Sequence, residues 1–448
     1  MREVARAHVV CTVGLDGRES FTAYVSPAGD RRPPSPVKVR SVVAQTMGGP
    51  GVPRDVVLLR ELPCDDQGVV DESRLDSVAI APYEEPATAV ERMLAPWWAE
   101  ALVLDRVGRA DDFFGLGGGS RAAAPVLARV SAELGVRVRD SDLVRASTLA
   151  GFAGLVEARR RGEHHDGAVV TVNADADGPG VFCLPGAGAS STHFAHLAAR
   201  LPGSPVHIVQ ARGYERPGVQ ELGLGGIVRR RVAAIRRLQP RGPYVVVGHS
   251  LGAVFALETA RRLQDEGEEV AVAILDPFWS ASGLGVDLGV APTVGEILTP
   301  ELIGRPGGLP PRHVLLLRRA RRLSALPLAN VLPMPAERRE RLLFTLGWVV
   351  GRTYRSAPWD GKVLAYRSAD NTDPDEMWRD LFPAPLVDRR YPCEHNSVLR
   401  PPYVDQVAAD LRDATATFSV RQPPSSGPAV PRRAVRSPAT RWRRARAR

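Results

Sequence analysis

Cysteine is scarce and widely scattered in this sequence. Its four cysteines stand at positions 11, 64, 183 and 393, without the paired spacing of a zinc site. Secreted domains that are held together by disulfides carry cysteine at a far higher density than this. We therefore expect reduced, structural cysteines, no bound metal, and a location in the cytoplasm.

Long apolar runs are also missing. No stretch approaches the roughly 20 apolar residues that a membrane helix requires. The opening residues, MREVARAHVV, lack the apolar core and cleavage site of a signal peptide. The sequence thus predicts neither a membrane span nor export. Its 448 residues, against about 100 to 200 for a typical domain, predict two or three folded domains.

Residues 421–448 contain no acidic residue but nine of the 59 basic residues. The rest of the chain therefore has 50 basic and 50 acidic residues and no formal net charge. The tail, residues 420–448, is rich in proline, serine and arginine and has little to bury, so we expect it to be disordered. Its arginines could contact the phosphates of a polyanion. We interpret it instead as a solvated extension, with nucleic acid not expected as a partner.

Composition breaks divide the remainder into three segments: residues 1–76, 84–161 and 169–419. The first segment alternates apolar and polar residues like two paired strands with a turn at Asp16 and Gly17. In the second, apolar residues recur at helical intervals, as in Leu127, Val130 and Leu134. The second segment therefore predicts a small helical bundle.

The second segment contains a serine in an unusual setting. The stretch DDFFGLGGGS places Ser120 after three glycines and at the start of a predicted helix. Glycine lets the chain turn tightly and keeps bulk away from the hydroxyl, while the free amides of a helix N-terminus favour a phosphate. A simple helix N-cap uses the same residue type, so these residues alone leave both interpretations open.

This stretch and the helices on either side resemble the carrier domains of nonribosomal peptide synthetases. The resemblance implies that a phosphopantetheinyl transferase attaches 4'-phosphopantetheine to Ser120, and that the thiol of this arm holds an acyl or peptidyl thioester. It also implies upstream condensation and adenylation proteins as partners. Gly119 replaces the family's common Asp or His, and Arg121 replaces its usual Leu or Ile. These two departures bear on the choice of partner enzyme.

The third segment carries a second serine, in GPYVVVGHSLGAVFALETARRL. The β-branched residues 244–247 predict a buried strand, and residues 251–263 predict a helix. Between them, GHSLG matches the nucleophile elbow of α/β-hydrolases, in which small residues allow a strained turn to expose Ser250. The GxSxG pattern alone is common, so the flanking strand and helix carry the prediction.

A serine nucleophile needs a histidine base, and the base needs a carboxylate that orients it. In this fold the acid and then the histidine follow the serine along the chain. Of the two histidines after Ser250, we choose His395, in a polar loop before the last amphipathic segment, over His313. The acid is either Asp276 or Asp370, because each follows a predicted strand.

Residues 169–419 resemble the thioesterase domains that terminate peptide and polyketide synthetases. The resemblance implies Asp276 as the catalytic acid and the Ala187 amide as one donor of the oxyanion hole. The Leu251 amide, directly after the nucleophile, is the other donor. The long stretch after Asp276 is expected to form a lid over the acyl chamber, with a helical strut as the alternative. His249 we interpret as structural.

Residues 1–76 resemble the end of the small C-terminal subdomain of adenylation domains. The closing motif of that family contains a lysine that contacts the nucleotide, but LPCDDQGVVD has Val69 at this position. A valine side chain has no charge and donates no hydrogen bond. We therefore expect no amino-acid activation here, and interpret the segment as a docking remnant or as the end of a synthetase that is split upstream.

The predicted fold class is multidomain: a small α+β segment, a helical carrier bundle, an α/β-hydrolase with a helical lid, and a disordered basic tail. The predicted activity is that of a thioesterase, which takes the acyl group from Ser120 to Ser250 within one chain and releases it by hydrolysis or cyclisation. Two alternatives are a non-catalytic carrier scaffold that docks partners and an editing thioesterase that clears misloaded carriers. The complete serine, histidine and aspartate set favours catalysis, and fusion to a carrier favours final release.

Overall fold

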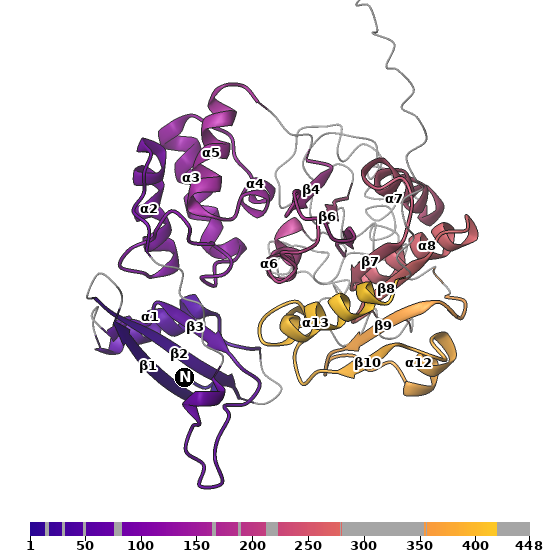
Figure 1. The fold of residues 1–448 in the computed structure, drawn as a ribbon, viewed down its shortest axis with the longest axis horizontal. Helices are drawn as coiled ribbons and strands as arrows, with labels where there is room; N and C mark the ends of the chain where they lie inside the picture. Colours follow the sequence, from indigo (N-terminus) through magenta and orange to yellow (C-terminus); the bar gives the residue numbers. More distant parts are fainter. Residues whose placement is uncertain are drawn as a thin grey trace, which may run out of the picture.

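The computed structural model describes residues 1–13, 18–28, 32–47, 51–75, 83–163, 167–186, 190–211, 223–277, 279, 354 and 356–418. These residues form three parts that lie against one another: a small N-terminal part, a helical bundle, and a larger part around a seven-stranded sheet (Figure 1). No helix within these ranges is long and apolar enough to cross a membrane. The stretch predicted as a lid, the basic tail, Ala187 and His313 lie outside the described residues.

The N-terminal part is a three-stranded sheet with one helix. Strands β1 (Val4–Val13) and β2 (Glu19–Pro27) pair antiparallel, as the alternating pattern predicts. Strand β3 (Asp55–Leu58) pairs parallel to β2, and helix α1 (Pro36–Met47) lies between them along the chain. The turn expected at the Asp-Gly pair lies outside the described residues. A short 3-10 turn, η2 (Glu72–Arg74), follows.

The second part is a bundle of four helices: α2 (Ala89–Leu102), α3 (Ser120–Leu134), α4 (Asp140–Arg145) and α5 (Leu149–Arg160). Trp98 is fully buried at its centre, and Phe113 meets it edge-on with 4.9 Å between ring centroids. Phe113 also packs under Gly118, where a Cβ would lie 2.4 Å from the phenyl ring. The predicted glycine stretch is therefore held against the helices by the aromatic residue before it.

The third part is built on a mixed sheet in the order β10-β9-β8-β7-β5-β6-β4. All neighbouring strands are parallel except β4, which runs antiparallel to β6. The strands are β4 (Val169–Val172), β5 (Val181–Leu184), β6 (Val206–Val209), β7 (Tyr244–His249), β8 (Val270–Leu275), β9 (Lys362–Arg367) and β10 (Val387–Arg390). Continuous apolar strands of this kind require cover on both faces.

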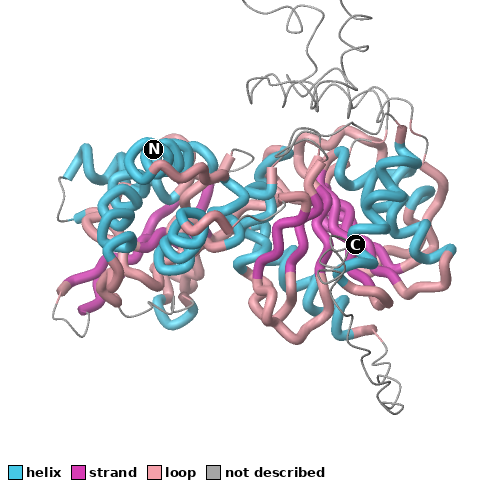
Figure 2. The backbone as a smooth tube through the Cα atoms, turned by 90° about the horizontal axis from the view of Figure 1, so that it is seen from above, coloured by secondary structure: helices cyan, strands magenta, loops and turns pink. Residues whose placement is uncertain are grey.

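Helices cover both faces of this sheet (Figure 2). Alternate strand residues enter separate cores: Val245 and Val247 pack with one set of helices, and Val246 with the other. The first core contains α6 (Ala195–Ala199) and α13 (Tyr403–Ala416), and the second contains α7 (Leu224–Leu238), α8 (Leu251–Asp265) and α12 (Asp375–Leu381). The first core continues into the helical bundle. The described residues thus confirm the predicted multidomain class with a layered α/β unit.

Candidate active site

Ser250 lies in the turn between β7 and α8. Its backbone has φ 57° and ψ −130°, a combination that costs a non-glycine residue of order 1–3 kcal/mol. The flanking glycines make the turn possible. A Cβ on Gly248 would lie 2.2 Å from the Gly252 carbonyl oxygen, and one on Gly252 would lie 2.0 Å from that of Leu184. This strand, strained turn and helix have the geometry expected of GHSLG.

The end of β5 packs directly under this turn. A Cβ on Gly186 would lie 3.0 Å from the His249 carbonyl oxygen and 3.3 Å from the Ser250 Cβ. Leu251, whose amide is expected to donate to the oxyanion, is the first residue of α8. The other expected donor, Ala187, follows Gly186 but lies outside the described residues.

The ring of His395 lies against a fully buried carboxylate. Its Nδ1 is 2.7 Å from Oδ2 of Asp276, which is 0% exposed. Because an ionised carboxylate only accepts, Nδ1 donates, and Nε2 of the neutral ring keeps the lone pair that a general base needs. The alternative acid, Asp370, contacts the backbone instead, since its Oδ2 accepts the His395 N–H at 2.7 Å.

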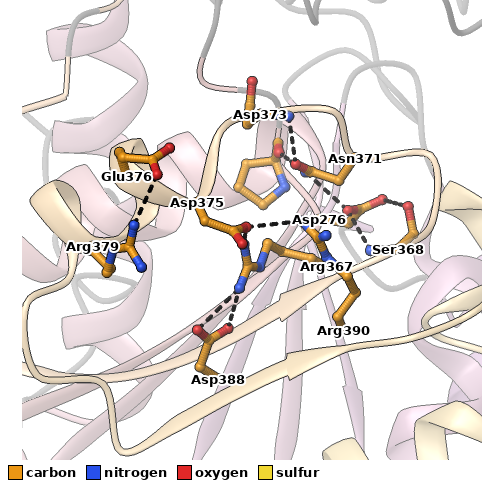
Figure 3. A network of polar contacts seen from close by, with 11 residues as sticks. Asp276, Arg367, Ser368, Asn371, Asp373, Asp375, Glu376, Arg379, Asp388 and Arg390 are labelled. Carbon is orange, nitrogen blue, oxygen red and sulfur yellow. Dashed lines mark hydrogen bonds and ion pairs between the residues drawn. The ribbon is translucent and has the colours of Figure 1, made fainter.

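The end of strand β9 supplies further donors to Asp276 (Figure 3). Ser368 donates its backbone N–H to Oδ1 at 2.8 Å and its hydroxyl to Oδ2 at 2.5 Å, and Asn371 Nδ2 donates to Oδ1 at 3.1 Å. Several donors stabilise a carboxylate that burial alone would disfavour. Ser368 and Asn371 were not anticipated from the sequence, although the polar stretch YRSADNTD directly after a predicted strand was the signal for them.

Arg367 anchors this strand end from the other side. Its guanidinium donates to Asp375 on α12 at 2.5 Å and to both carboxylate oxygens of Asp388 on β10 at 3.0 and 3.1 Å (Figure 3). Nη1 donates to Asp375 and Nη2 to Asp388, so two carboxylates from different elements fix the orientation of the guanidinium. The network therefore holds Ser368, the next residue, in place beside Asp276.

Two further histidines lie behind the His395 ring. His249 Nε2 is 3.0 Å from the His395 carbonyl oxygen, which can only accept, so Nε2 carries the proton and Nδ1 accepts from His193 Nε2 at 2.9 Å. The ring centroids follow one another at 4.5 and 4.6 Å. Burial and the neighbouring positive groups lower the pKa of His193 to about 3 and that of His249 well below its usual value. Both rings are therefore neutral near pH 7.

His249 thus contacts His395, the expected base, through its ring and its Nε2–H. It also brings Ser250, its neighbour in the chain, close to the segment of His395. His193 was not anticipated from the sequence, because no motif marks it and its role depends on a contact with a strand far along the chain.

Ser120 is exposed at the first position of α3, and Gly119 before it holds the N-cap position. The serine is therefore not the cap of this helix. A Cβ on Gly119 would have nothing within 4 Å, so the space beside the loop residue before Ser120 is open. An exposed hydroxyl, open space and the free amides of a helix N-terminus fit a phosphodiester at this position.

The hydroxyl of Ser120 lies next to the larger part of the chain. Its Oγ is 3.0 Å from Oγ1 of Thr192, in the 3-10 turn η3 (Ser191–Phe194). Nearby, α4 packs on β4 and η3, and Arg145 donates to the Val169 carbonyl oxygen at 3.1 Å. Thr192 immediately precedes His193, which hydrogen-bonds to His249, the residue before Ser250. Ser120 is therefore connected to the Ser250 turn through this short series of contacts.

Comparison with known families finds two matches. The family described as a phosphopantetheine attachment site matches residues 97–156, and the thioesterase domain family matches residues 179–277. The chain contains a carrier domain followed by a thioesterase domain. The first match supports 4'-phosphopantetheine as a cofactor that is attached covalently to the carrier domain. Ser120 falls within the first match, and Ser250 and Asp276 within the second.

Several peptide synthases and other synthetases are similar to this chain. Malpinin synthetase from Mortierella alpina is 33% identical over 61% of this chain and 4% of its own length. The dimodular nonribosomal peptide synthase of Bacillus subtilis is 27% identical over 90% of this chain and 17% of its own length. A solved four-domain synthetase bound to AMP and glycine aligns with 92% of this chain and 32% of its own, at 20% identity and a TM-score of 0.43. The chain thus spans 4% and 17% of these two curated relatives.

Proposed function

We propose that this chain holds an acyl or peptidyl thioester on the 4'-phosphopantetheine of Ser120, transfers the acyl group to Ser250, and releases it by hydrolysis or cyclisation. The observation that carries the proposal is the hydrogen bond from His395 Nδ1 to the buried Asp276, in the segment that adjoins the Ser250 turn. The contact between Ser120 and Thr192 supports the transfer within one chain.

In the proposed mechanism, the arm supplies a thiol that activates the acyl group and a tether that delivers it. Nε2 of His395 accepts the Ser250 proton as Oγ attacks the thioester carbonyl, and Asp276 stabilises the imidazolium that forms. The amides of Leu251 and Ala187 stabilise the oxyanion. His395 returns the proton to the leaving sulfur, which leaves the acyl group as an ester on Ser250.

Release repeats the same steps on the ester. His395 removes a proton from water, or from an amine or hydroxyl of the acyl chain, and returns it to Ser250 Oγ as the ester bond breaks. Water gives a free acid, and an internal nucleophile gives a ring. Proposed partners are the upstream condensation and adenylation proteins and a phosphopantetheinyl transferase. A cytoplasmic location is part of the proposal, because all four cysteines carry free thiols.

Replacing Ser250 with alanine tests this proposal. After phosphopantetheinyl transfer and acyl loading, mass spectrometry of the intact variant should show a stable acyl load on Ser120, while the wild type loses it. Ser120→Ala should carry no arm at all. A fluorophosphonate probe should label the wild type at Ser250 but not Ser250→Ala. Unchanged release by Ser250→Ala would reject the mechanism, and an unlabelled wild type would favour the non-catalytic scaffold.

A further inference from the structure

The described residues of the N-terminal segment, 1–13, 18–28, 32–47 and 51–75, contact both of the other domains. Figure 1 shows α1 and β3 directly beside the helical bundle, with β3 on the side of the N-terminal part that faces α13. We propose that this segment is a clamp: it fixes the carrier domain on the thioesterase domain so that Ser120 faces Thr192. The proposal builds on the proposed function, because the clamp would serve the transfer from Ser120 to Ser250.

One contact with the carrier domain is made by Arg40 of α1, which is 0% exposed. Its Nε donates to the Leu102 carbonyl oxygen at 2.8 Å, and its Nη2 donates to the Leu116 carbonyl oxygen. Its Nη1 donates at 3.0 Å to the carbonyl oxygen of Arg54, within the N-terminal segment. The planar guanidinium of Arg40 therefore joins the N-terminal segment to the end of α2 and to the glycine loop that precedes Ser120.

Two other contacts secure the same surface. Arg54 Nη2 donates to Asp111 Oδ1 at 2.5 Å, in the loop that leads to Ser120. Pro36 packs on Gly117, where a Cβ would lie 2.4 Å from the proline ring, so only glycine fits beneath it. Gly117 also has φ 83°, which an L side chain rarely adopts. The glycines before Ser120 are thus matched to the N-terminal segment as well as to the hydroxyl.

The contact with the thioesterase domain is made by Arg60, just after β3. Its guanidinium lies 4.8 Å from the ring centroid of Tyr391 and 5.7 Å from that of Tyr403. Both tyrosines are buried, and their rings are 5.2 Å apart. Tyr391 lies four residues before His395 in the chain, so Arg60 rests on the segment that carries the base.

These contacts link three domains through side chains of the segment that has Val69 in place of the adenylation lysine. A carrier that is held only by a flexible tether would visit many orientations. The effective concentration of its thioester at Ser250 would therefore be lower than for a fixed carrier. A carrier held by Arg40 and Arg60 keeps Ser120 at η3. The clamp therefore gives this segment a role that requires no nucleotide chemistry.

The test uses the full chain and three arginine variants. Arg40→Met removes the guanidinium while retaining an unbranched apolar side chain, and Arg60→Ala removes only the exposed side chain over the two tyrosines. Arg74→Ala is the matched control, since Arg74 is exposed on η2 of the same segment. Three quantities are measured: release of an acyl group loaded on Ser120, hydrolysis of a small soluble acyl thioester, and amide hydrogen exchange at residues 190–194.

We expect Arg40→Met to slow release from Ser120 by about tenfold or more, and Arg60→Ala by about threefold. Both variants should hydrolyse the soluble thioester like the wild type, because that substrate does not need the carrier. Amides at residues 190–194 should exchange faster in both variants, as the docked carrier no longer covers them. Arg74→Ala should match the wild type in all three measurements.

The clamp is refuted if Arg40→Met and Arg60→Ala leave both release and hydrogen exchange unchanged. It is equally refuted if both variants lose soluble-thioester hydrolysis in parallel with release, since the segment then supports only the fold. Failure of the wild type to act on either thioester would instead reject the proposed function. In that case the exchange comparison still decides whether the segment holds the carrier in place.

Discussion

Asp276 and Asp370 both hydrogen-bond to His395, so asparagine at each position separates their roles. In Asp276→Asn, the new amide oxygen should face the Ser368 N–H and Asn371 Nδ2, which are donors to Oδ1 now. The amide nitrogen then takes the place of Oδ2 and donates to His395 Nδ1. The ring is forced into the tautomer with its proton on Nε2, and it can no longer accept the Ser250 proton.

The expected loss is large because the variant keeps its geometry and loses the base. Wrong-tautomer substitutions of this kind lower kcat by about 10⁴-fold, or about 5 kcal/mol of transition-state stabilisation. In Asp370→Asn, the amide oxygen can still accept the backbone N–H of His395. We expect that variant to lose less than about tenfold, as for one neutral hydrogen bond.

The assay is single-turnover hydrolysis of a soluble acyl thioester, with thermal unfolding of each variant as the control for folding. The ratio between the two variants should be about 10³-fold or more. Loss of activity in Asp370→Asn with near wild-type activity in Asp276→Asn would refute the assignment of the acid. Equal, small losses in both would refute the role of His395 as the base.

Three further predictions address support, charge and stability. Ser368→Ala removes one hydrogen bond to the Asp276 carboxylate, the proposed catalytic acid, and should lower kcat by about tenfold without changing KM, as measured by steady-state kinetics. Burial lowers the pKa of His249 below 6.5, so below pH 6.5 the unfolded chain binds more protons at this residue than the folded chain does. Acidification should therefore lower the free energy of unfolding by up to about 1.4 kcal/mol per pH unit through this group. Urea unfolding between about pH 7.5 and about pH 5 should show a smaller loss in His249→Gln. Trp98→Ala should cost the carrier domain about 3–5 kcal/mol and reduce its phosphopantetheinylation, as followed by urea unfolding and mass spectrometry.

The strand, turn and helix around Ser250 could be predicted from the sequence because their determinants are local. The strand over residues 244–247 and the helix over residues 251–263 are both present, as β7 and α8. Leu127 and Leu134, in contrast, are only partly buried on α3, where Val126 is 1% exposed. Helical spacing defines an apolar stripe but not its centre, which depends on how the neighbouring helices α2 and α4 pack.

The acid and the role of the N-terminal segment could not be obtained from spacing. Asp276 and Asp370 follow adjacent strands, and the sheet places both beside His395, so only their hydrogen bonds distinguish them. Arg40 is a charged residue on a short helix, which normally indicates a solvated position. Its burial depends on carbonyl oxygens from two other segments, Leu102 and Leu116, that no local pattern connects with it.

His249 can stand beside Ser250 without competing as a base because both of its ring nitrogens are engaged: Nδ1 accepts from His193, and Nε2–H donates to the His395 carbonyl oxygen. Its Nε2–H is needed for the His395 carbonyl oxygen, and a carbon side chain could not make that bond. In the proposed mechanism, transfer of the Ser250 proton places a positive charge on the His395 ring, whose centroid lies 4.6 Å from that of His249. A second positive charge at that distance would cost about 4 kcal/mol at an effective dielectric constant of about 20. Because burial lowers the pKa of His249, the proposed mechanism would place its positive charge on the one ring that is paired with Asp276.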